Sequence, residues 1–245
     1  AANVPSISCT SSATLFSTGS PNTRIGKDSI LLGYSSTRRL EACSVSYMDS
    51  QSHYFDEDPA GRIENYTVDL VLPDITATLR TSSGVFSSKR IDPGTKYLLQ
   101  EAPPPDTAVK TALDLGCGYG PIARILCHRF PEAQIWATDI NSRARALTIE
   151  NVGKFGVNVE HPDRIDKDIQ FDLIWSNPPV RIGKSKLYAL LDLWLQRLSD
   201  DGEAILVVQK HLGADSLSKW LDKVSYNVQR LSSKSGYRLL KVTVK

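Results

Sequence analysis

The spacing of apolar residues divides the chain into three parts. Residues 1–52 are rich in Ser and Thr and show no sustained apolar period. Residues 53–106 contain two β-rich runs, Tyr66–Leu72 and Ile75–Leu79. Residues 107–245 alternate between short apolar runs and segments with helical spacing. We therefore expect a poorly defined lead, a short β-rich extension and a larger third domain.

Turn-forming residues interrupt the extension. Pro73-Asp74 separates its two expected strands, and Ser83-Gly84 and Asp92-Pro93-Gly94 supply the glycine and proline of tight turns. Three consecutive prolines, Pro103–Pro105, then predict a stiff connector. The extension is thus expected to consist of short strands and turns.

The third part has the element order of an α/β fold. Strands are expected at 108–115, 134–138, 157–160, 171–175, 203–209, 226–231 and 237–244, and helices at 121–130, 142–155, 184–198 and 214–223, with Ser142 as an N-cap. Alternation of strands and helices predicts a mostly parallel sheet covered on both faces. The last two strands have no helix between them, so one antiparallel C-terminal strand is expected.

Composition excludes few functions. The chain has 245 residues, 41% of them hydrophobic and 23% charged, and a net charge of +2, which neither requires nor excludes a nucleic-acid partner. Its four cysteines form no Cys-x-x-Cys pair, so neither a zinc site nor a disulfide framework is predicted. No His or Cys spacing fits a metal site.

No apolar run approaches the roughly 20 residues that a membrane span needs. The N-terminus has no apolar segment typical of a secretory signal. A cytoplasmic protein is therefore expected. The Ser- and Arg-rich lead also has the composition of an organelle transit peptide, so import is the alternative, and a disordered tail fits the same composition.

A glycine-rich loop, Asp114 to Gly120, joins the first strand of the third part to its first helix. Its Gly-x-Gly-x-Gly spacing lets the backbone approach a ligand but differs from the spacing of dinucleotide sites. A ligand that fits such a loop is the methyl donor S-adenosylmethionine, because it has no pyrophosphate. Its cationic sulfonium group favours a nearby carboxylate such as Asp114. Asp139 ends the next strand, where an acid can accept hydrogen bonds from both ribose hydroxyls. The glycines alone would also fit a packing turn, but their pairing with Asp139 favours a donor site.

A second motif, Ser176-Asn177-Pro178-Pro179-Val180, follows the strand at 171–175. Prolines fix the backbone and keep the preceding residue extended, so Asn177 is held at a carboxyl strand edge, where α/β sheets bind ligands. The side-chain carbonyl of Asn177 and the backbone carbonyl of Pro178 can both accept hydrogen bonds from a planar NH2 group. The motif predicts orientation of a substrate rather than acid–base catalysis. Alone, it would also fit a stiff loop with a capping Asn.

These motifs, in this order and with Asp139-Ile140-Asn141 between them, resemble the class I methyltransferases. More narrowly, the chain resembles the small-domain ribosomal RNA guanine-N2 methyltransferases and their single-domain archaeal relatives. The narrower resemblance covers residues 53–245 and rests on further segments at 53–55, 83–87, 92–96, 177–184, 213–217 and 236–241. Bacterial members carry a duplicated N-terminal domain that helps to bind RNA, for which this chain has no room.

The resemblance implies a Rossmann-like, mostly parallel seven-stranded sheet and an S-adenosylmethionine-binding catalytic domain at 107–245. It implies methyl transfer to the 2-amino group of a guanine, in free ribosomal RNA or in a ribosomal particle, without a metal. The short link between Asp163 and Phe171 implies that one helix of the wider fold is missing.

The resemblance also implies the site residues. The catalytic residues would be Asn177, Pro178 and Pro179. The donor site would comprise Asp114, Gly116, Cys117, Gly118, Gly120, Asp139, Ile140, Asp163, Asn177, Phe86 and Thr95. In that site Asp163 would receive the adenine amine, and Phe86 and Thr95 would lie near the methionine end. The substrate would meet Val180, Arg181 and Lys184.

Two other functions remain as alternatives. Protein glutamine-amide N-methyltransferases resemble the chain at Asn-Pro-Pro but usually end that motif in tyrosine, and adenine-amine enzymes usually carry an aromatic residue there. Val180 therefore favours guanine over both. An inactive donor-binding or RNA-binding subunit is the other alternative, against which the intact Asp114, Asp139 and Asn177 argue. Arg181, Lys184 and Lys186 either meet RNA phosphates or form a solvated helix start.

Overall fold

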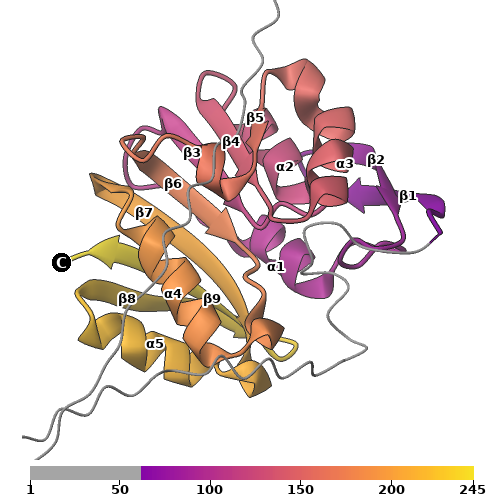
Figure 1. The fold of residues 1–245 in the computed structure, drawn as a ribbon. Helices are drawn as coiled ribbons and strands as arrows, with labels where there is room; N and C mark the ends of the chain where they lie inside the picture. The colour runs from indigo at the N-terminus through magenta and orange to yellow at the C-terminus, as the bar shows by residue number, and fades with distance from the viewer. Residues whose placement is uncertain (1–61) are drawn as a thin grey trace, which may run out of the picture. The chain divides into compact units, whose positions relative to one another are not determined.

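A seven-stranded sheet organises the protein. The computed structural model describes residues 62–245, so the expected lead at 1–52 lies outside the described residues. The strand order is β5-β4-β3-β6-β7-β9-β8 (Figure 1). The bounds are β3 Thr111–Leu115, β4 Gln134–Thr138, β5 Asn158–Glu160, β6 Phe171–Ser176, β7 Leu198–Gln209, β8 Tyr226–Lys234 and β9 Tyr237–Val244.

The direction of the strands confirms the predicted fold class. Strands β3 to β7 pair in parallel, and β9 runs antiparallel to both β7 and β8. Between β5 and β6 there is one short 3-10 turn, Pro162–Arg164, and no α-helix, as the short link predicted. The fold is therefore Rossmann-like with a single antiparallel C-terminal strand.

Five helices cover the two faces of the sheet (Figure 1). They are α1 Pro93–Glu101, α2 Pro121–Arg129, α3 Ser142–Val152, α4 Lys184–Leu195 and α5 Ala214–Lys223. Side chains of α1, α2 and α3 form one core, and those of α4 and α5 form the other. Successive strand residues alternate between the cores, as Ala112 and Leu113 of β3 show, because side chains of a strand point to opposite faces.

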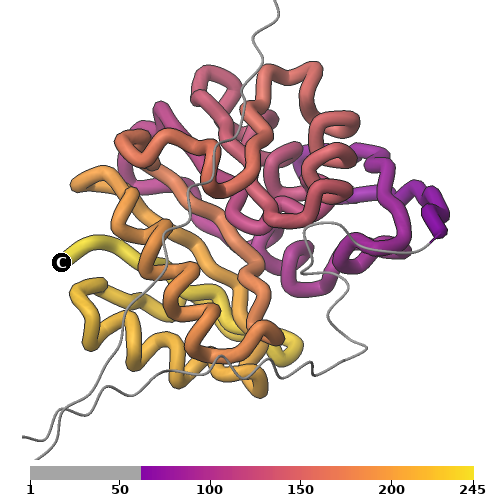
Figure 2. The backbone as a smooth tube through the Cα atoms, in the orientation of Figure 1, coloured from indigo at the N-terminus to yellow at the C-terminus, as the bar shows by residue number. Residues whose placement is uncertain are grey.

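A two-stranded hairpin precedes the sheet. Its strands, β1 Asn65–Val71 and β2 Thr76–Ser82, pair antiparallel and confirm the two strands predicted in the extension. Val68, Leu70 and Leu79 are buried on its inner face and join the core of α1, α2 and α3. The backbone trace shows the hairpin and the C-terminal strands at opposite ends of the described residues (Figure 2).

Two predictions of local structure are wrong. The segment read as a turn at Asp92-Pro93-Gly94 begins helix α1, because the Asp92 carboxylate caps its N-terminus and Pro93 stands at its first position. Ser142 is the first residue of α3 rather than its N-cap. Asn141 is the cap, since its Oδ1 accepts a hydrogen bond from the Ala144 N–H at 3.0 Å.

The sheet topology creates one natural site for a ligand. The chain passes from β3 to β4 on one side and from β6 to β7 on the other, so the strand order reverses between β3 and β6. Ligands bind outside the carboxyl ends of strands at such a point. The glycine loop follows β3 and the Asn-Pro-Pro motif follows β6, so the topology places both motifs there.

None of the helices within residues 62–245 has the length and apolar character of a membrane span.

Candidate functional site

A cavity of about 550 Å³ opens at the carboxyl ends of β3, β4 and β6. Most of the predicted site residues line it. These are Phe86, Thr95, Gly116, Cys117, Gly118, Asp139, Ile140, Asn177, Pro178, Pro179, Val180 and Arg181. The structure leaves Asp114, Gly120, Asp163 and Lys184 outside the wall. The two motifs are therefore brought together in one site, as the topology requires.

The glycine loop leaves room for a ligand. Gly116 and Gly118 have φ values of 78° and 56°, and a Cβ added at either position would meet no atom within 4 Å. The backbone N–H groups of Gly116 and Cys117 donate to the Thr138 carbonyl, each at 2.9 Å, which holds the loop against the end of β4. The loop is thus a fixed, open cradle that side chains would fill.

Asp139 supports the loop from the end of β4. Its Oδ2 accepts from the Gly118 N–H and its Oδ1 from the Asn141 N–H, both at 3.0 Å. Burial raises the pKa of this carboxyl, although the backbone hydrogen bonds oppose that effect. Each carboxylate oxygen can accept a further hydrogen bond. Asp139 can therefore hold the loop and also receive ligand hydroxyls.

Asp114 lies behind the loop rather than in the cavity. Its side chain is fully buried, and its Oδ2 accepts from the Ala123 N–H at 2.9 Å in the first turn of α2. The other oxygen has no hydrogen-bond partner among the described residues. Burial raises the pKa of this carboxyl to about 8, so its neutral form is favoured at neutral pH. The attraction of Asp114 for a cationic ligand stays a prediction.

The Asn177 amide is fixed in one orientation. Its Nδ2 donates to Asp92 Oδ1 at 2.8 Å and to Thr95 Oγ1 at 3.0 Å. The reversed amide would set its oxygen against the Asp92 carboxylate, which cannot donate. Both N–H bonds of Asn177 are therefore used, and its carbonyl oxygen is left to accept a hydrogen bond from a ligand in the cavity.

Asp92 is the site residue that sequence reasoning missed. Besides Asn177, its Oδ1 accepts from the backbone N–H groups of Gly94 at 2.8 Å and Thr95 at 3.0 Å. One carboxylate thus caps α1 and holds the amide of Asn177 in the Asn-Pro-Pro motif. The available signal was the sequence Asp-Pro-Gly-Thr, in which an acid precedes a proline as at a helix start.

The two prolines shape the loop after Asn177. The Pro178 carbonyl accepts from the Val180 N–H at 2.8 Å, and Pro179 has φ −74° and ψ 73°. These values describe an inverse γ-turn. The Pro178 oxygen keeps one lone pair, so its predicted role as a second acceptor for a substrate amine is compatible with this turn.

The remaining predicted residues fall around the rim. Arg181 and Lys186 line the cavity, whereas Lys184 does not. All three side chains are exposed. The Asp163 side chain is 90% exposed, and its neighbour Pro162 contributes to the wall instead. The role predicted for Asp163 at an adenine amine stays a prediction. Among residues 62–245, no group of three or more His, Cys, Asp or Glu side chains is placed to hold a metal ion.

Comparisons with known proteins identify the family of the chain. The model of the family described as methyltransferase small domain matches residues 76–241. A Bacillus subtilis protein named as uncharacterized protein YbxB is 33% identical over 195 residues, which cover 77% of this chain and 96% of the relative. Ribosomal RNA small subunit methyltransferase C of Shewanella loihica is 30% identical over 184 residues, covering 71% of this chain and 53% of the relative. The chain thus spans about half the length of that enzyme.

A solved structure shares the fold. It is a T. Thermophilus 16S rRNA N2 methyltransferase in complex with AdoMet and guanosine, with a TM-score of 0.60 and 20% sequence identity. The match covers 76% of this chain and 52% of that one.

Proposed function

The chain belongs to the methyltransferase small-domain family, and on that premise we propose that it transfers a methyl group from S-adenosylmethionine to the 2-amino group of a guanine in ribosomal RNA. The observation that carries this proposal is the fixed orientation of Asn177. No residue of 62–245 donates to its carbonyl oxygen, which can accept a hydrogen bond from an exocyclic amine. The names of the curated relatives as ribosomal RNA methyltransferases support the choice of RNA.

The cavity fits the proposed donor. Gly116 and Gly118 leave open space along one wall, and Asp139 offers acceptor capacity beside them. Ile140, 42% exposed, and Phe86, 46% exposed, present apolar surface to the same cavity. The glycines, Asp139 and Ile140 would hold the adenosine part, with Phe86 and Thr95 toward the methionine part. The bound donor supplies an electrophilic methyl group on a cationic sulfur.

The residues of the chain contribute orientation. The Asn177 carbonyl accepts a hydrogen bond from one N–H group of the amine, and the Pro178 carbonyl can accept a hydrogen bond from the other. Two fixed acceptors hold the NH2 group in place and direct the nitrogen lone pair toward the methyl group. Placing reactants in line supplies much of the acceleration in such a transfer. The N–C bond forms as the S–C bond breaks, and the amine then releases one proton to solvent.

Val180 supports guanine over other planar amines. It lines the cavity directly after the two prolines and is aliphatic. Enzymes that flip an adenine into such a site commonly stack it on an aromatic side chain. The T. Thermophilus enzyme also supports the choice of guanine, since its structure was solved in complex with guanosine.

Transfer of labelled methyl groups tests the proposed function. S-adenosylmethionine carrying a tritiated methyl group is incubated with the protein and with total RNA or total protein that lacks endogenous modification, and the nucleosides are then separated. We expect label in RNA as N2-methylguanosine. Label only in protein would replace the proposal with glutamine-amide methylation. Label in neither, with donor bound, would rule out naked RNA as the substrate.

A substitution of Asn177 tests the observation that carries the proposal. In Asn177→Ala we expect kcat to fall about 100-fold, because the amine is no longer oriented, while the donor Kd changes little. Asn158→Ala is the matched control, since Asn158 does not line the cavity. Kinetics of RNA methylation and calorimetric titration of the donor measure the two quantities. Full activity of Asn177→Ala would refute the orienting role.

A further inference from the structure

A second hollow lies beside the catalytic cavity, along strand β1. It has a volume of about 380 Å³. We call it the β1 groove, and its lining consists of Thr67, Val68, Asp69, Leu70, Val71, Lys89, Arg90, Ile91 and Lys96. Arg90 also lines the cavity that contains Asn177, so the two hollows adjoin at this residue. A ligand in the cavity could therefore continue into the groove.

The side chains of the groove favour an anion. Lys89, Arg90 and Lys96 are exposed, and none forms an ion pair with a carboxylate of residues 62–245. The Lys89 ammonium lies 5.3 Å from the centre of the Tyr66 ring, on β1. Asp69 is the single acid of the lining, and its Oδ1 accepts from the Thr78 hydroxyl at 2.7 Å. Three cations thus face one carboxylate.

The backbone of β1 adds hydrogen-bond donors. The Ser83 N–H donates to the Glu64 carbonyl at 2.8 Å and the Leu72 N–H to the Ile75 carbonyl at 2.9 Å. Since bonded pairs alternate along an antiparallel ladder, the even-numbered residues of β1 pair with β2. The N–H groups of Thr67, Asp69 and Val71 therefore point away from β2, to an edge with which no other strand of residues 62–245 pairs, and these three residues line the groove.

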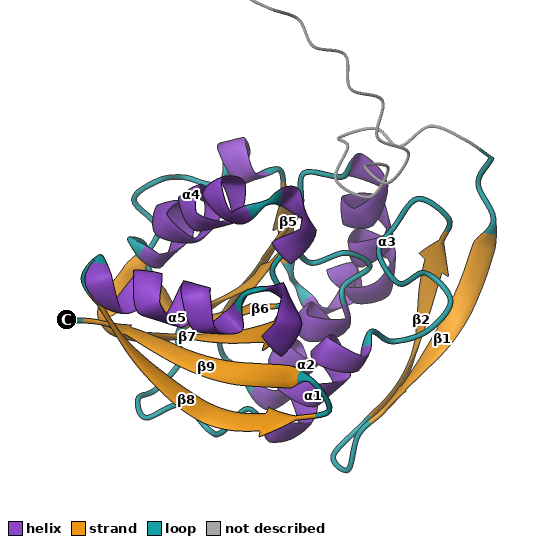
Figure 3. Ribbon diagram, turned by 90° about the horizontal axis from the view of Figure 1, so that it is seen from below, coloured by secondary structure: helices purple, strands orange, loops and turns teal. Residues whose placement is uncertain are grey.

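The opposite edge of the hairpin is closed. The side chain of Asn151, on α3, accepts from the Arg80 N–H and donates to the Arg80 carbonyl, each at 2.8 Å. Strand β2 is thus attached to the catalytic domain, and β1 is the outer strand (Figure 3). Among residues 62–245, no strand pairs with the outer edge of β1, and Lys89, Arg90 and Lys96, which follow the hairpin in the chain, line the groove beside it.

We propose that the β1 groove binds the sugar–phosphate backbone of the RNA strand that flanks the target guanine. This inference rests on the proposed function. A nucleotide seated in the cavity leaves the phosphates of its neighbours outside, and Arg90 lines both the cavity and the groove. Phosphate contacts by Lys, Arg and backbone N–H groups position a nucleic acid without reading its sequence. The groove would thus set the register of the RNA.

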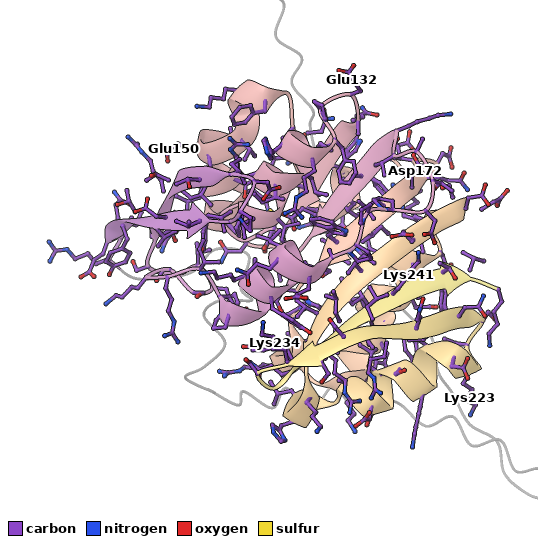
Figure 4. The ribbon with its side chains drawn as sticks, turned by 180° about the vertical axis from the view of Figure 1, so that it is seen from behind. Glu132, Glu150, Asp172, Lys223, Lys234 and Lys241 are labelled. Atoms are coloured by element: carbon purple, nitrogen blue, oxygen red, sulfur yellow. The ribbon has the colours of Figure 1, made fainter. Side chains whose placement is uncertain are left out.

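A pair of double variants tests the groove. Lys89→Ala/Lys96→Ala removes two of its cations, neither of which lines the catalytic cavity. Lys219→Ala/Lys223→Ala is the matched control: it removes two exposed lysines of α5, and Lys223 lies at the far end from the hairpin (Figure 4). Both variants lose the same net charge, so a difference between them reports position and not total charge.

Binding of unmodified small-subunit ribosomal RNA, transcribed in vitro, is measured by filter retention over a range of salt concentrations. We expect the groove variant to bind about tenfold more weakly. Its slope of log K against log salt should be shallower by about 1.4, because each phosphate contact to a single strand contributes about 0.7. The control variant should match wild type, and the donor Kd should be unchanged in all three proteins.

A third variant changes the groove in the opposite direction. Asp69→Asn keeps an acceptor for the Thr78 hydroxyl and removes the one negative charge, so RNA binding should tighten about threefold. The groove would be overturned if both double lysine variants weakened RNA binding equally. It would also be overturned if neither the double variants nor Asp69→Asn changed RNA binding. If wild type methylates RNA and the groove variant matches the control, only this inference fails. Label confined to protein would defeat the proposed function itself.

Discussion

At the scale of single residues, the proposed chemistry depends on which way the Asn177 amide points. Asp92 and Thr95 fix the orientation of this amide, because they accept the two hydrogen bonds that its nitrogen donates. In Asp92→Ala we expect kcat for RNA methylation to fall about tenfold with little change in the donor Kd, and we expect stability to fall by about 1 kcal/mol through loss of the α1 cap. Kinetics at a temperature where circular dichroism shows every variant folded will separate the two effects.

The conservative variant provides the control. Asp92→Asn keeps an oxygen that can accept from Asn177 and from the N-terminus of α1, so its kcat should stay within about threefold of wild type. If Asp92→Ala and Asp92→Asn lose activity equally, the carboxylate charge matters rather than the hydrogen bond. Unchanged kcat in Asp92→Ala would show that Asn177 needs no partner.

Single residues were predictable where the chain itself carries the constraint. The prolines after Asn177 restrict the backbone locally, so its position at a strand edge followed from the sequence. Asp92 lies 85 residues away from Asn177, and no local pattern reports a contact made only by the folded chain. The exclusion of Asp114 from the cavity was hidden for the same reason, because α2 covers its carboxyl.

At the scale of elements, the glycine loop combines two requirements that the sequence pattern does not distinguish. Gly118 faces the open cavity, whereas a Cβ on Gly120 would lie 3.1 Å from the Thr148 Cγ2. Both have positive φ, so alanine is strained at either position. We expect Gly120→Ala to cost about 2 kcal/mol of stability, roughly 1 kcal/mol more than Gly118→Ala, because it also displaces α3.

Donor binding should show the opposite order. Gly118→Ala places a methyl group in the cradle and should weaken the donor at least tenfold, while Gly120→Ala should change the Kd less. Urea unfolding and calorimetric titration measure the two quantities. A Gly118→Ala protein that binds the donor as tightly as wild type would show that the cradle is not the donor site.

Length did not decide which elements were predicted correctly: the five-residue strand β4 was, whereas the twelve-residue strand β7 begins at Leu198, five residues before the strand predicted at 203–209. Strands β4 and β9 and helix α5 match their predicted bounds. Helix α1 has nine residues and begins with Asp-Pro-Gly, which is equally typical of a turn. Its capping and its burial against β7 and β9 decide the matter, and both depend on tertiary structure.

At the scale of the whole molecule, the site is assembled from two sequence regions. Val85, Phe86, Asp92 and Thr95 precede the sheet, whereas Gly116–Gly118 and Asn177–Val180 follow its strands β3 and β6. All of them line one cavity. The sheet class could be predicted, because alternation of strands and helices enforces parallel pairing. The docking of residues 85–95 against the carboxyl edge could not, because it depends on packing rather than on period.

Lys241 forms one ion pair inside the sheet and a second one with Asp106, the residue after the Pro103–Pro105 connector. Lys241 on β9 lies 2.6 Å from Glu203 on β7, which is 3% exposed, and it also contacts Asp106, which is 81% exposed. These two acids offer a matched comparison on one lysine. Glu203→Ala leaves a largely buried ammonium without its inner partner and should lower the free energy of unfolding by about 3 kcal/mol.

Removing the outer acid should matter far less. Asp106→Ala should cost no more than about 1 kcal/mol, because an exposed carboxylate gains little from an ion pair in water. Urea unfolding at pH 7 followed by circular dichroism measures both variants, and neither residue lines the cavity, so the donor Kd should stay at its wild-type value. Equal losses of the free energy of unfolding in the two variants would mean that the ion pair with Asp106 stabilises the protein as much as the one with Glu203. A loss of donor affinity in Glu203→Ala alone would mean that the interior of the sheet also sets the geometry of the site at its edge.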